Sequence, residues 1–176
     1  DNINYTNDSF LRNTRDFGLP QNRPRVYIMG FNKEYFKNKI YSLDNELPKK
    51  SDTIIYKDLK EVLDKIVPAK YFLSEGYLNT LEKHKTRHSK KGNGFGYMIV
   101  NKREGKYSYS NALLATGGSG KERNLILDEV NDHAGKIVPN KKTPINKKNI
   151  RNMTPTEWAK LQGFKNYAFL DEKGND

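Results

Sequence analysis

The 176-residue sequence contains no cysteine. Without cysteine the chain forms no disulfide, offers no thiolate ligand to zinc and supplies no cysteine nucleophile. No apolar run approaches the roughly 20 residues that a membrane-spanning helix needs, so we expect no membrane partner. Hydrophobic residues are few, at 35 %, but aromatic residues make up 11 %. That composition predicts a folded protein with a thin core rather than a disordered chain.

Acidic residues are also in short supply relative to basic ones. Lys and Arg number 32 against 21 Asp and Glu, which gives a net charge of +11 and a sequence pI near 9.6. The excess positive side chains repel one another unless a polyanion offsets their charge. Nucleic acid is the commonest partner of this kind, and the charge therefore favours a nucleic-acid-binding protein. A lysine-rich solvated surface with no such partner is the alternative.

The pattern of apolar residues predicts short elements separated by loops. Residues 25–31 form a run of β-formers and predict a buried strand; residues 97–100 and 124–127 are two further strand candidates. Apolar positions at helical spacing predict helices over residues 59–66 and 75–88. Residues 131–149 are polar and lysine-rich, which is typical of a linker or surface loop. No internal repeat is present.

The clearest local signal is a helix start near the C-terminal end. Thr154 suits the N-cap, Pro155 the first helical position, and Glu157 completes a capping box. Gly163 is the expected stop.

Two patterns resemble known sites but fail their requirements. Residues 117–121 resemble a phosphate-binding loop, yet Ala115 stands where that loop needs its first Gly, and Glu122 where it needs Ser or Thr. His84 and His88 lie four residues apart, as two metal ligands would. The basic residues around them would repel a cation and no third ligand is obvious, so we expect no metal site.

Two stretches carry a family resemblance. Residues 16–31 contain Gly18-Leu19-Pro20 followed by Gln21, Arg23 and Arg25, and residues 151–164 read Arg-Asn-Met-Thr-Pro-Thr-Glu before Leu-Gln-Gly-Phe. The first closely resembles the Gln-x-Arg-x-Arg motif of DNA cytosine-5 methyltransferases, and the second the same family's Thr-Pro-Arg-Glu helix. Thr156 replaces the usual Arg and Trp158 a small residue. Two such stretches, in this order, favour that family strongly.

The resemblance implies an α+β organisation. Residues 1–35 would be a remnant of the Rossmann-like catalytic sheet, residues 36–150 a small mixed target recognition domain of short strands and loops, and residues 151–176 a helix that packs back onto the catalytic domain. Within the middle segment, residues 92–97 resemble family members that act on short GC-rich sites. Ala112 stands where the family has Thr in a Thr-Leu pair, and Leu113 matches the Leu.

The rest of the family pattern is absent from these residues. They contain no Phe-x-Gly-x-Gly cofactor loop, no Pro-Cys-Gln nucleophile loop and no Glu-Asn-Val motif. The resemblance therefore implies part of a bacterial, cytoplasmic restriction-modification enzyme that is inactive alone. It would need a catalytic domain or subunit with the missing motifs. The complete enzyme would use S-adenosylmethionine, and this chain alone would bind none.

Candidate site residues follow from the resemblance and from DNA chemistry. Arginine forms paired hydrogen bonds while permanently charged. By resemblance Arg25 faces O2 of the flipped cytosine, Arg23 steadies the catalytic Glu or a nearby phosphate, and Gln21 contacts DNA in the same pocket. The alternative is that these arginines make local ion pairs at the strand.

A second set is expected to grip double-stranded DNA outside that pocket. A glycine-rich loop allows close approach to base edges, where Arg123 or Lys121 would read guanine and Asn124 adenine. Basic residues in the last turn of the predicted helix and just after it would contact phosphates. The expected contacts are Lys85, Arg87, His88, Lys90, Lys91, Asn93, Thr116, Gly117, Gly118, Ser119, Gly120, Lys121, Arg123 and Asn124. An ordinary hairpin turn is the alternative for the loop.

Two other functions stay open at this point. One is a stand-alone sequence-specific DNA-binding module without catalysis. The other is a generic basic RNA-binding domain, which would prefer single-stranded RNA to duplex DNA.

Overall fold

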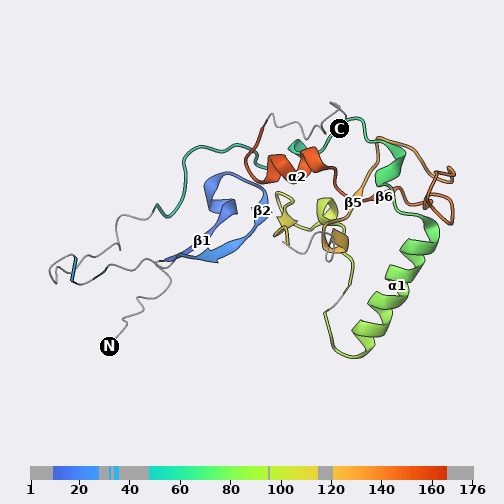
Figure 1. Ribbon diagram of the computed structural model, residues 1–176, viewed down its shortest axis with the longest axis horizontal. Helices are drawn as coiled ribbons and strands as arrows, with labels where there is room; N and C mark the ends of the chain where they lie inside the picture. The colour runs from blue at the N-terminus through green and yellow to red at the C-terminus, as the bar shows by residue number, and fades with distance from the viewer. Residues whose placement is uncertain are drawn as a thin grey trace.

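The computed structural model describes residues 10–27, 32, 34–35, 48–94, 96–114 and 121–165. Within these ranges two α-helices and six short strands alternate with 3-10 turns (Figure 1). The helices are α1 (Glu75–Lys90) and α2 (Pro155–Leu161). The strands are β1 (Leu11–Asn13), β2 (Gln21–Asn22), β3 (Pro24–Val26), β4 (Ser110–Asn111), β5 (Ile126–Leu127) and β6 (Ile150–Arg151). The predicted mixture of helix and strand is confirmed.

The strands pair into three two-stranded sheets. β1 and β3 are antiparallel, with Arg12 opposite Arg25. β2 and β4 are parallel, with Gln21 opposite Ser110, so the Gln-x-Arg-x-Arg segment joins a segment far along the chain. β5 and β6 are antiparallel, with Ile126 opposite Arg151.

The apolar core is divided into three small clusters, as the low hydrophobic content predicts. The largest joins residues from the middle of the chain to α2, and the second lies under α1. The third surrounds Phe72. Helix α2 thus packs directly on residues of the 36–150 segment. The buried members of the first cluster are Leu59, Val62, Val100, Ile126, Met153 and Leu161.

Helix α1 confirms the predicted helix and extends it to Lys90. The Ser74 hydroxyl caps its first turn by accepting from the backbone N–H of Tyr77, which satisfies a donor left open at the helix start. Leu78 is buried, whereas nearly every residue after Glu82 is exposed. The C-terminal half of α1 therefore projects from the body (Figure 1). No helix of the described ranges is long and apolar enough to cross a membrane.

Helix α2 begins as the sequence predicts. Thr154 and Glu157 form the complete capping box, with Pro155 in the first turn. Gly163 follows with φ +93°, a left-handed conformation that glycine adopts at little cost.

Several elements of the structure differ from those that the sequence predicts. Residues 59–66 form only a 3-10 turn at Leu59–Glu61; the i, i+3 spacing that suggested an α-helix fits three residues per turn equally well. Residues 97–100 form an isolated bridge from Ile99 to Leu125 instead of a strand, and of residues 124–127 only Ile126–Leu127 is strand.

The expected buried strand over residues 25–31 is also different in its described part. β3 covers Pro24–Val26 and is exposed along its length, because β1 pairs with one edge and no layer covers its faces among the described residues. Residues 28–31 lie outside the described ranges.

Residues 131–149 contain no named helix or strand, as predicted, but they are not simply a surface loop. Ile145 and Asn146 are buried. The Asn146 amide donates to the carbonyls of Leu73 and Ile150 at 2.7 and 2.8 Å, and its oxygen accepts from the Ile150 N–H at 2.9 Å. One polar side chain thereby holds this loop, the start of α1 and β6 together.

Candidate functional site

The Gln-x-Arg-x-Arg segment runs through β2 and β3, and its three side chains differ in exposure. Gln21 is fully buried, Arg23 is half-buried and Arg25 is exposed. The Arg25 guanidinium donates to the carbonyl of Pro24, so it is held near the strand but remains open to solvent. Among the described residues no carboxylate forms an ion pair with Arg23 or Arg25.

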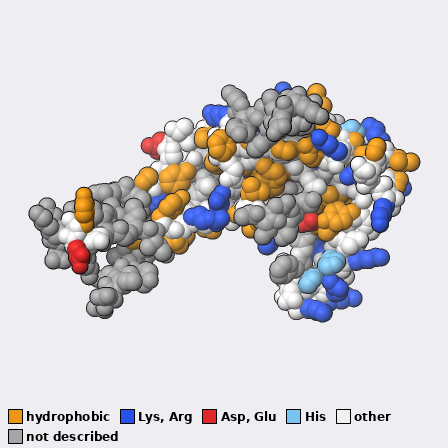
Figure 2. All heavy atoms as spheres, viewed as in Figure 1, with side chains coloured by type: hydrophobic (Ala, Val, Ile, Leu, Met, Phe, Trp, Pro, Cys, Tyr) orange, Lys and Arg blue, Asp and Glu red, His pale blue; other side chains and the backbone are white. Residues whose placement is uncertain are grey.

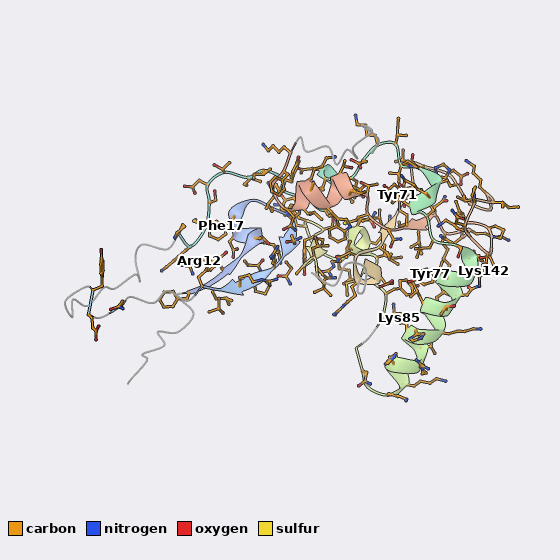
Figure 3. The ribbon with its side chains drawn as sticks, in the orientation of Figure 1. Arg12, Phe17, Tyr71, Tyr77, Lys85 and Lys142 are labelled. Carbon is orange, nitrogen blue, oxygen red and sulfur yellow. The ribbon has the colours of Figure 1, made fainter. Side chains whose placement is uncertain are left out.

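A pocket of about 610 Å³ opens beside these strands. Figure 3 places two of its residues, Arg12 and Phe17, near β1. Its lining combines three arginines with apolar side chains, and none of the lining residues is acidic. They are Arg12, Asn13, Thr14, Phe17, Arg23, Arg25, Val26, Tyr27 and Pro48. This combination suits a flat, partly apolar group that carries hydrogen-bond acceptors or negative charge.

Gln162, at the end of α2, connects the two resembling stretches. Its Oε1 accepts a hydrogen bond from Arg23 Nη1 at 2.8 Å, and its Nε2 donates to Gln21 Oε1 at 3.5 Å. The backbone N–H of Gln162 caps α2. The side chain therefore projects from the helix end onto the Gln-x-Arg-x-Arg segment. The Gln21 amide nitrogen has no partner among the described residues.

A buried ion cluster fixes α2. Arg151 is 1 % exposed; its Nε donates to Asp128 Oδ2 at 2.6 Å and its two terminal nitrogens to the Glu157 carboxylate at 2.8 Å each. Burial lowers the pKa of Arg151, but its hydrogen bonds to Glu157 and Asp128 outweigh burial and the pKa is raised. Glu157 also accepts from the backbone N–H of Asp64. The Arg and Glu of the second stretch thus bind each other inside the protein.

Asp64 holds α2 from its other side. The hydroxyl of Thr154, the hydroxyl of Thr156 and the ammonium of Lys160 all donate to its carboxylate. Burial raises the pKa of Asp64, but these hydrogen bonds outweigh burial and hold its pKa below the usual value. Thr156, which stands where the family usually has Arg, therefore serves as a further contact to Asp64.

Asn111, in β4, connects the pocket side of the molecule to the predicted base-reading residues. Its backbone N–H donates to Asn124 Oδ1 at 2.7 Å and its amide to the Arg123 carbonyl at 2.6 Å. Its own oxygen accepts from Arg103 at 2.6 Å. Asn124 is buried, so its side chain orients Asn111 and does not reach the surface.

The last turns of α1 carry several basic side chains. Figure 2 shows Lys and Arg side chains, in blue, gathered on its projecting end beside histidine side chains, in pale blue. Lys83, Arg87 and Lys90 follow one face at helical spacing and line a shallow hollow with Asn79, Glu82 and Thr86. Lys91 and Asn93 are exposed beyond the helix end.

The other face of α1 turns toward Arg123. A pocket of about 370 Å³ is lined by His84, His88, Tyr97 and Arg123, among others. The two histidine rings stack with centroids 5.8 Å apart, and the Lys85 ammonium lies 4.9 Å from the Tyr97 ring centroid. In Figure 3 Tyr77 and Lys85 mark this region, at the opposite end of the molecule from Arg12.

Glu122, the acid next to Arg123 in sequence, is hydrogen-bonded to Tyr77. The Tyr77 hydroxyl donates to Glu122 at 2.5 Å. Burial and this bond raise the pKa of Tyr77 to about 12. Arg123 forms no ion pair within the described residues.

The structure brings together some predicted residues and leaves others out. Gln21, Arg23 and Arg25 lie in the segment that runs through β2 and β3, whereas Lys85, Arg87 and His88 lie on α1. Arg123 lies between the two groups: its side chain lines the pocket beside α1, and its carbonyl is bound by Asn111 of β4, the strand that pairs with β2. Residues 116–120 and the side chain of Lys121 lie outside the described part. No cluster of three or more metal-binding side chains occurs among the described residues.

Sequence reasoning missed Gln162, Asn111 and Arg103. Gln162 belongs to the Leu-Gln-Gly-Phe match, so its position in that motif was a signal. Asn111 and Arg103 gave none, because a lone polar residue reveals its partners only after folding.

The chain is similar in sequence to several type II methyltransferases. The type II methyltransferase M.HpaII of Haemophilus parainfluenzae is 44 % identical over 154 residues, which cover 86 % of this chain and 39 % of the relative. M1.ScrFI of Lactococcus lactis subsp. cremoris is 32 % identical over 92 % of the chain and 35 % of the relative. M.SsoII of Shigella sonnei is 33 % identical over 92 % of the chain and 36 % of the relative. No solved structure matches the chain.

The chain spans less than two-fifths of the length of these relatives. Residues 1–174 match the family described as C-5 cytosine-specific DNA methylase. Because that match extends over almost the whole chain, the protein belongs to the C-5 cytosine-specific DNA methylase family.

Proposed function

We propose that this chain is the target-recognition part of a type II DNA cytosine-5 methyltransferase of a restriction-modification system. It binds duplex DNA, reads the target sequence and helps to hold the flipped cytosine. The observation that carries the proposal is the Gln162–Arg23 hydrogen bond. It joins the family's two resembling stretches beside an arginine-lined pocket.

The pocket at β1–β3 suits the flipped base. A cytosine must leave the stack before its ring can react, and it then presents a flat ring, an O2 acceptor and flanking phosphates. Arg25 is exposed at the pocket and takes the O2 contact. Arg23, held by Gln162, steadies the catalytic Glu of the complete enzyme or a phosphate.

Base reading is assigned to the surface where Arg123 faces α1. Arg123 is exposed and unpaired by any described carboxylate, and a guanidinium forms two hydrogen bonds with guanine O6 and N7. The glycine-rich residues 116–120 and Lys121 remain predicted DNA contacts beside Arg123. Asn124 is reassigned to orienting Asn111. Lys85, Arg87, His88, Lys90 and Lys91 contact phosphates and position the duplex.

The pocket at β1–β3 does not suit S-adenosylmethionine. That cofactor carries a sulfonium cation, and the pocket at β1–β3 is lined by three arginines and no carboxylate. The chain also supplies no cysteine for attack on cytosine. Cofactor binding and the covalent step are therefore assigned to a catalytic domain or subunit that carries the missing motifs.

Reconstitution tests the proposal. The chain would be mixed with a catalytic part of a related methyltransferase that lacks the matching region. Transfer of a labelled methyl group to duplex DNA is expected only when both are present. Arg25→Ala should abolish transfer while leaving most duplex binding. Methyl transfer by this chain alone would overturn the proposal, and duplex binding that never supports transfer would indicate a stand-alone DNA-binding module.

A further inference from the structure

Tyr109, immediately before β4, holds two cations. The guanidinium carbon of Arg15 lies 4.1 Å from the centroid of its ring and that of Arg103 lies 4.4 Å away. Attraction to the ring offsets part of the repulsion between the two guanidinium groups. Two residues distant in sequence are thus brought together by one aromatic side chain.

Tyr107, two residues earlier, repeats the arrangement with lysines. The Lys57 ammonium lies 4.8 Å from its ring centroid and the Lys106 ammonium 5.5 Å. A hydrogen bond from Lys57, aided by Lys106, lowers the pKa of the Tyr107 hydroxyl. Four cations and two tyrosines therefore form one cluster, which we call the Tyr107–Tyr109 cluster: Arg15, Lys57, Arg103, Lys106, Tyr107 and Tyr109.

The positive charge of this cluster is poorly balanced. None of its four cations belongs to an ion pair in the described part of the chain. Of the acids around the cluster, Asp58 accepts from Ser108, and Glu61 accepts from the backbone N–H of Lys57 and attracts the Lys57 ammonium. The Nε of Arg103 has no partner among the described residues. An approaching anion would relieve repulsion between like charges held this close.

The cluster lies next to β4, between the Gln-x-Arg-x-Arg segment and Arg123. Tyr109 precedes β4, which pairs with β2 and so with the Gln-x-Arg-x-Arg segment. Arg103 donates to Asn111, whose amide holds the carbonyl of Arg123. In Figure 1 the yellow β4 lies between β2 and β5. The cluster therefore lies between the pocket at β1–β3 and the residues assigned to base reading.

We propose that the Tyr107–Tyr109 cluster binds the sugar-phosphate backbone of duplex DNA between the flipped cytosine and the bases that are read. This inference rests on the proposed function, because it assumes a duplex that extends from the pocket at β1–β3 to Arg123 and α1. The cluster contacts phosphates and carries no sequence information of its own. Tyrosine rings hold the arginines and lysines at fixed positions, so fewer side-chain motions are lost on binding.

The salt dependence of binding tests the inference. Affinity of the 176-residue chain for a duplex would be measured from low to high salt by fluorescence anisotropy. Arg15→Gln and Lys106→Gln remove the charge of two exposed cations of the cluster while keeping long polar side chains. Removing one phosphate-binding cation should reduce the slope of log K against log salt by about 0.9, so the double variant should reduce it by about 2.

Matched variants separate DNA binding from folding. Lys70 lies 5.2 Å from the Tyr71 ring as a single cation–aromatic pair, and Lys70→Gln should leave the slope unchanged. Tyr109→Phe keeps the ring and should bind like the unmodified chain, whereas Tyr109→Leu should weaken binding. Circular dichroism melting checks that each variant is folded.

The outcomes distinguish the two proposals. A wild-type chain that does not bind duplex DNA overturns both. Duplex binding whose salt slope is the same in the Arg15→Gln, Lys106→Gln variant and in Lys70→Gln overturns the inference alone. A reduced slope seen with single-stranded RNA but not with duplex DNA would overturn it as well.

Discussion

Gln162 Oε1 accepts a hydrogen bond from Arg23 Nη1 at 2.8 Å, across 139 residues of sequence. The same amide donates to Gln21. Helix α2 therefore has a role besides packing, because the residue at its C-terminal end sets the position of an arginine in the proposed cytosine pocket. The buried Arg151–Glu157 pair at the other end of α2 fixes the helix from which Gln162 projects.

Gln162→Ala should lower methyl transfer by the reconstituted enzyme on the order of a hundred-fold, because a small misplacement near the reacting base is costly. Duplex binding should change little. Gln162→Glu should recover most of the activity, since a carboxylate still accepts from Arg23. The measurement is the rate of single-turnover methyl transfer beside the affinity for DNA. Equal rates for Gln162→Ala and the unmodified chain would contradict the positioning role.

Arg151→Met should destabilise the chain by about 3–5 kcal/mol, because it leaves the carboxylates of Asp128 and Glu157 buried without their partner. Urea unfolding followed by circular dichroism measures the free energy of unfolding. Lys148→Met is the matched control: it removes an exposed pair with Glu82 and should cost less than about 1 kcal/mol. Similar losses for the two variants would show that the Arg151 cluster contributes little.

Stability should fall in acid. Burial raises the pKa values of Asp64 and Asp128, but hydrogen bonds to Lys160 and to Asn131 and Arg151 respectively outweigh burial and leave both pKa values below the usual range. A carboxyl whose pKa is lower in the folded state stabilises the protein above its unfolded pKa and loses that contribution as pH falls through the folded value. The decline is therefore expected below about pH 4. Asp64→Asn should flatten it, and an unchanged acid profile for that variant would argue against the Asp64 network.

The sequence was most informative where a local rule decides the structure. Thr154 caps α2 where the sequence predicts, since capping depends on three or four neighbouring residues. Helix α1 begins at Glu75, as the apolar positions at helical spacing predict. The apolar spacing predicts a helix over residues 59–66, but the structure forms only a 3-10 turn at Leu59–Glu61, because burial of Leu59 and Val62 needs only a three-residue spacing. The rings that collect Arg15, Arg103, Lys57 and Lys106 join distant segments, and no local pattern indicates such contacts.

In the candidate site, too, local patterns in the sequence are informative and contacts between distant segments are not predicted. Gln21, Arg23 and Arg25 are predicted from a motif that is contiguous in sequence. Asn124 was expected to face DNA, but it is buried and bound to Asn111, because its exposure depends on the packing of β4 against the following turn.

Selection of bound duplexes from a random-sequence pool tests the central claim most directly. The unmodified chain should enrich one short sequence containing a cytosine, and the reconstituted enzyme should methylate that cytosine. Arg123→Ala should lose discrimination worth about 1–3 kcal/mol at one position while still binding DNA. Enrichment of no sequence by the unmodified chain, or the same sequence preference in Arg123→Ala, would contradict the account.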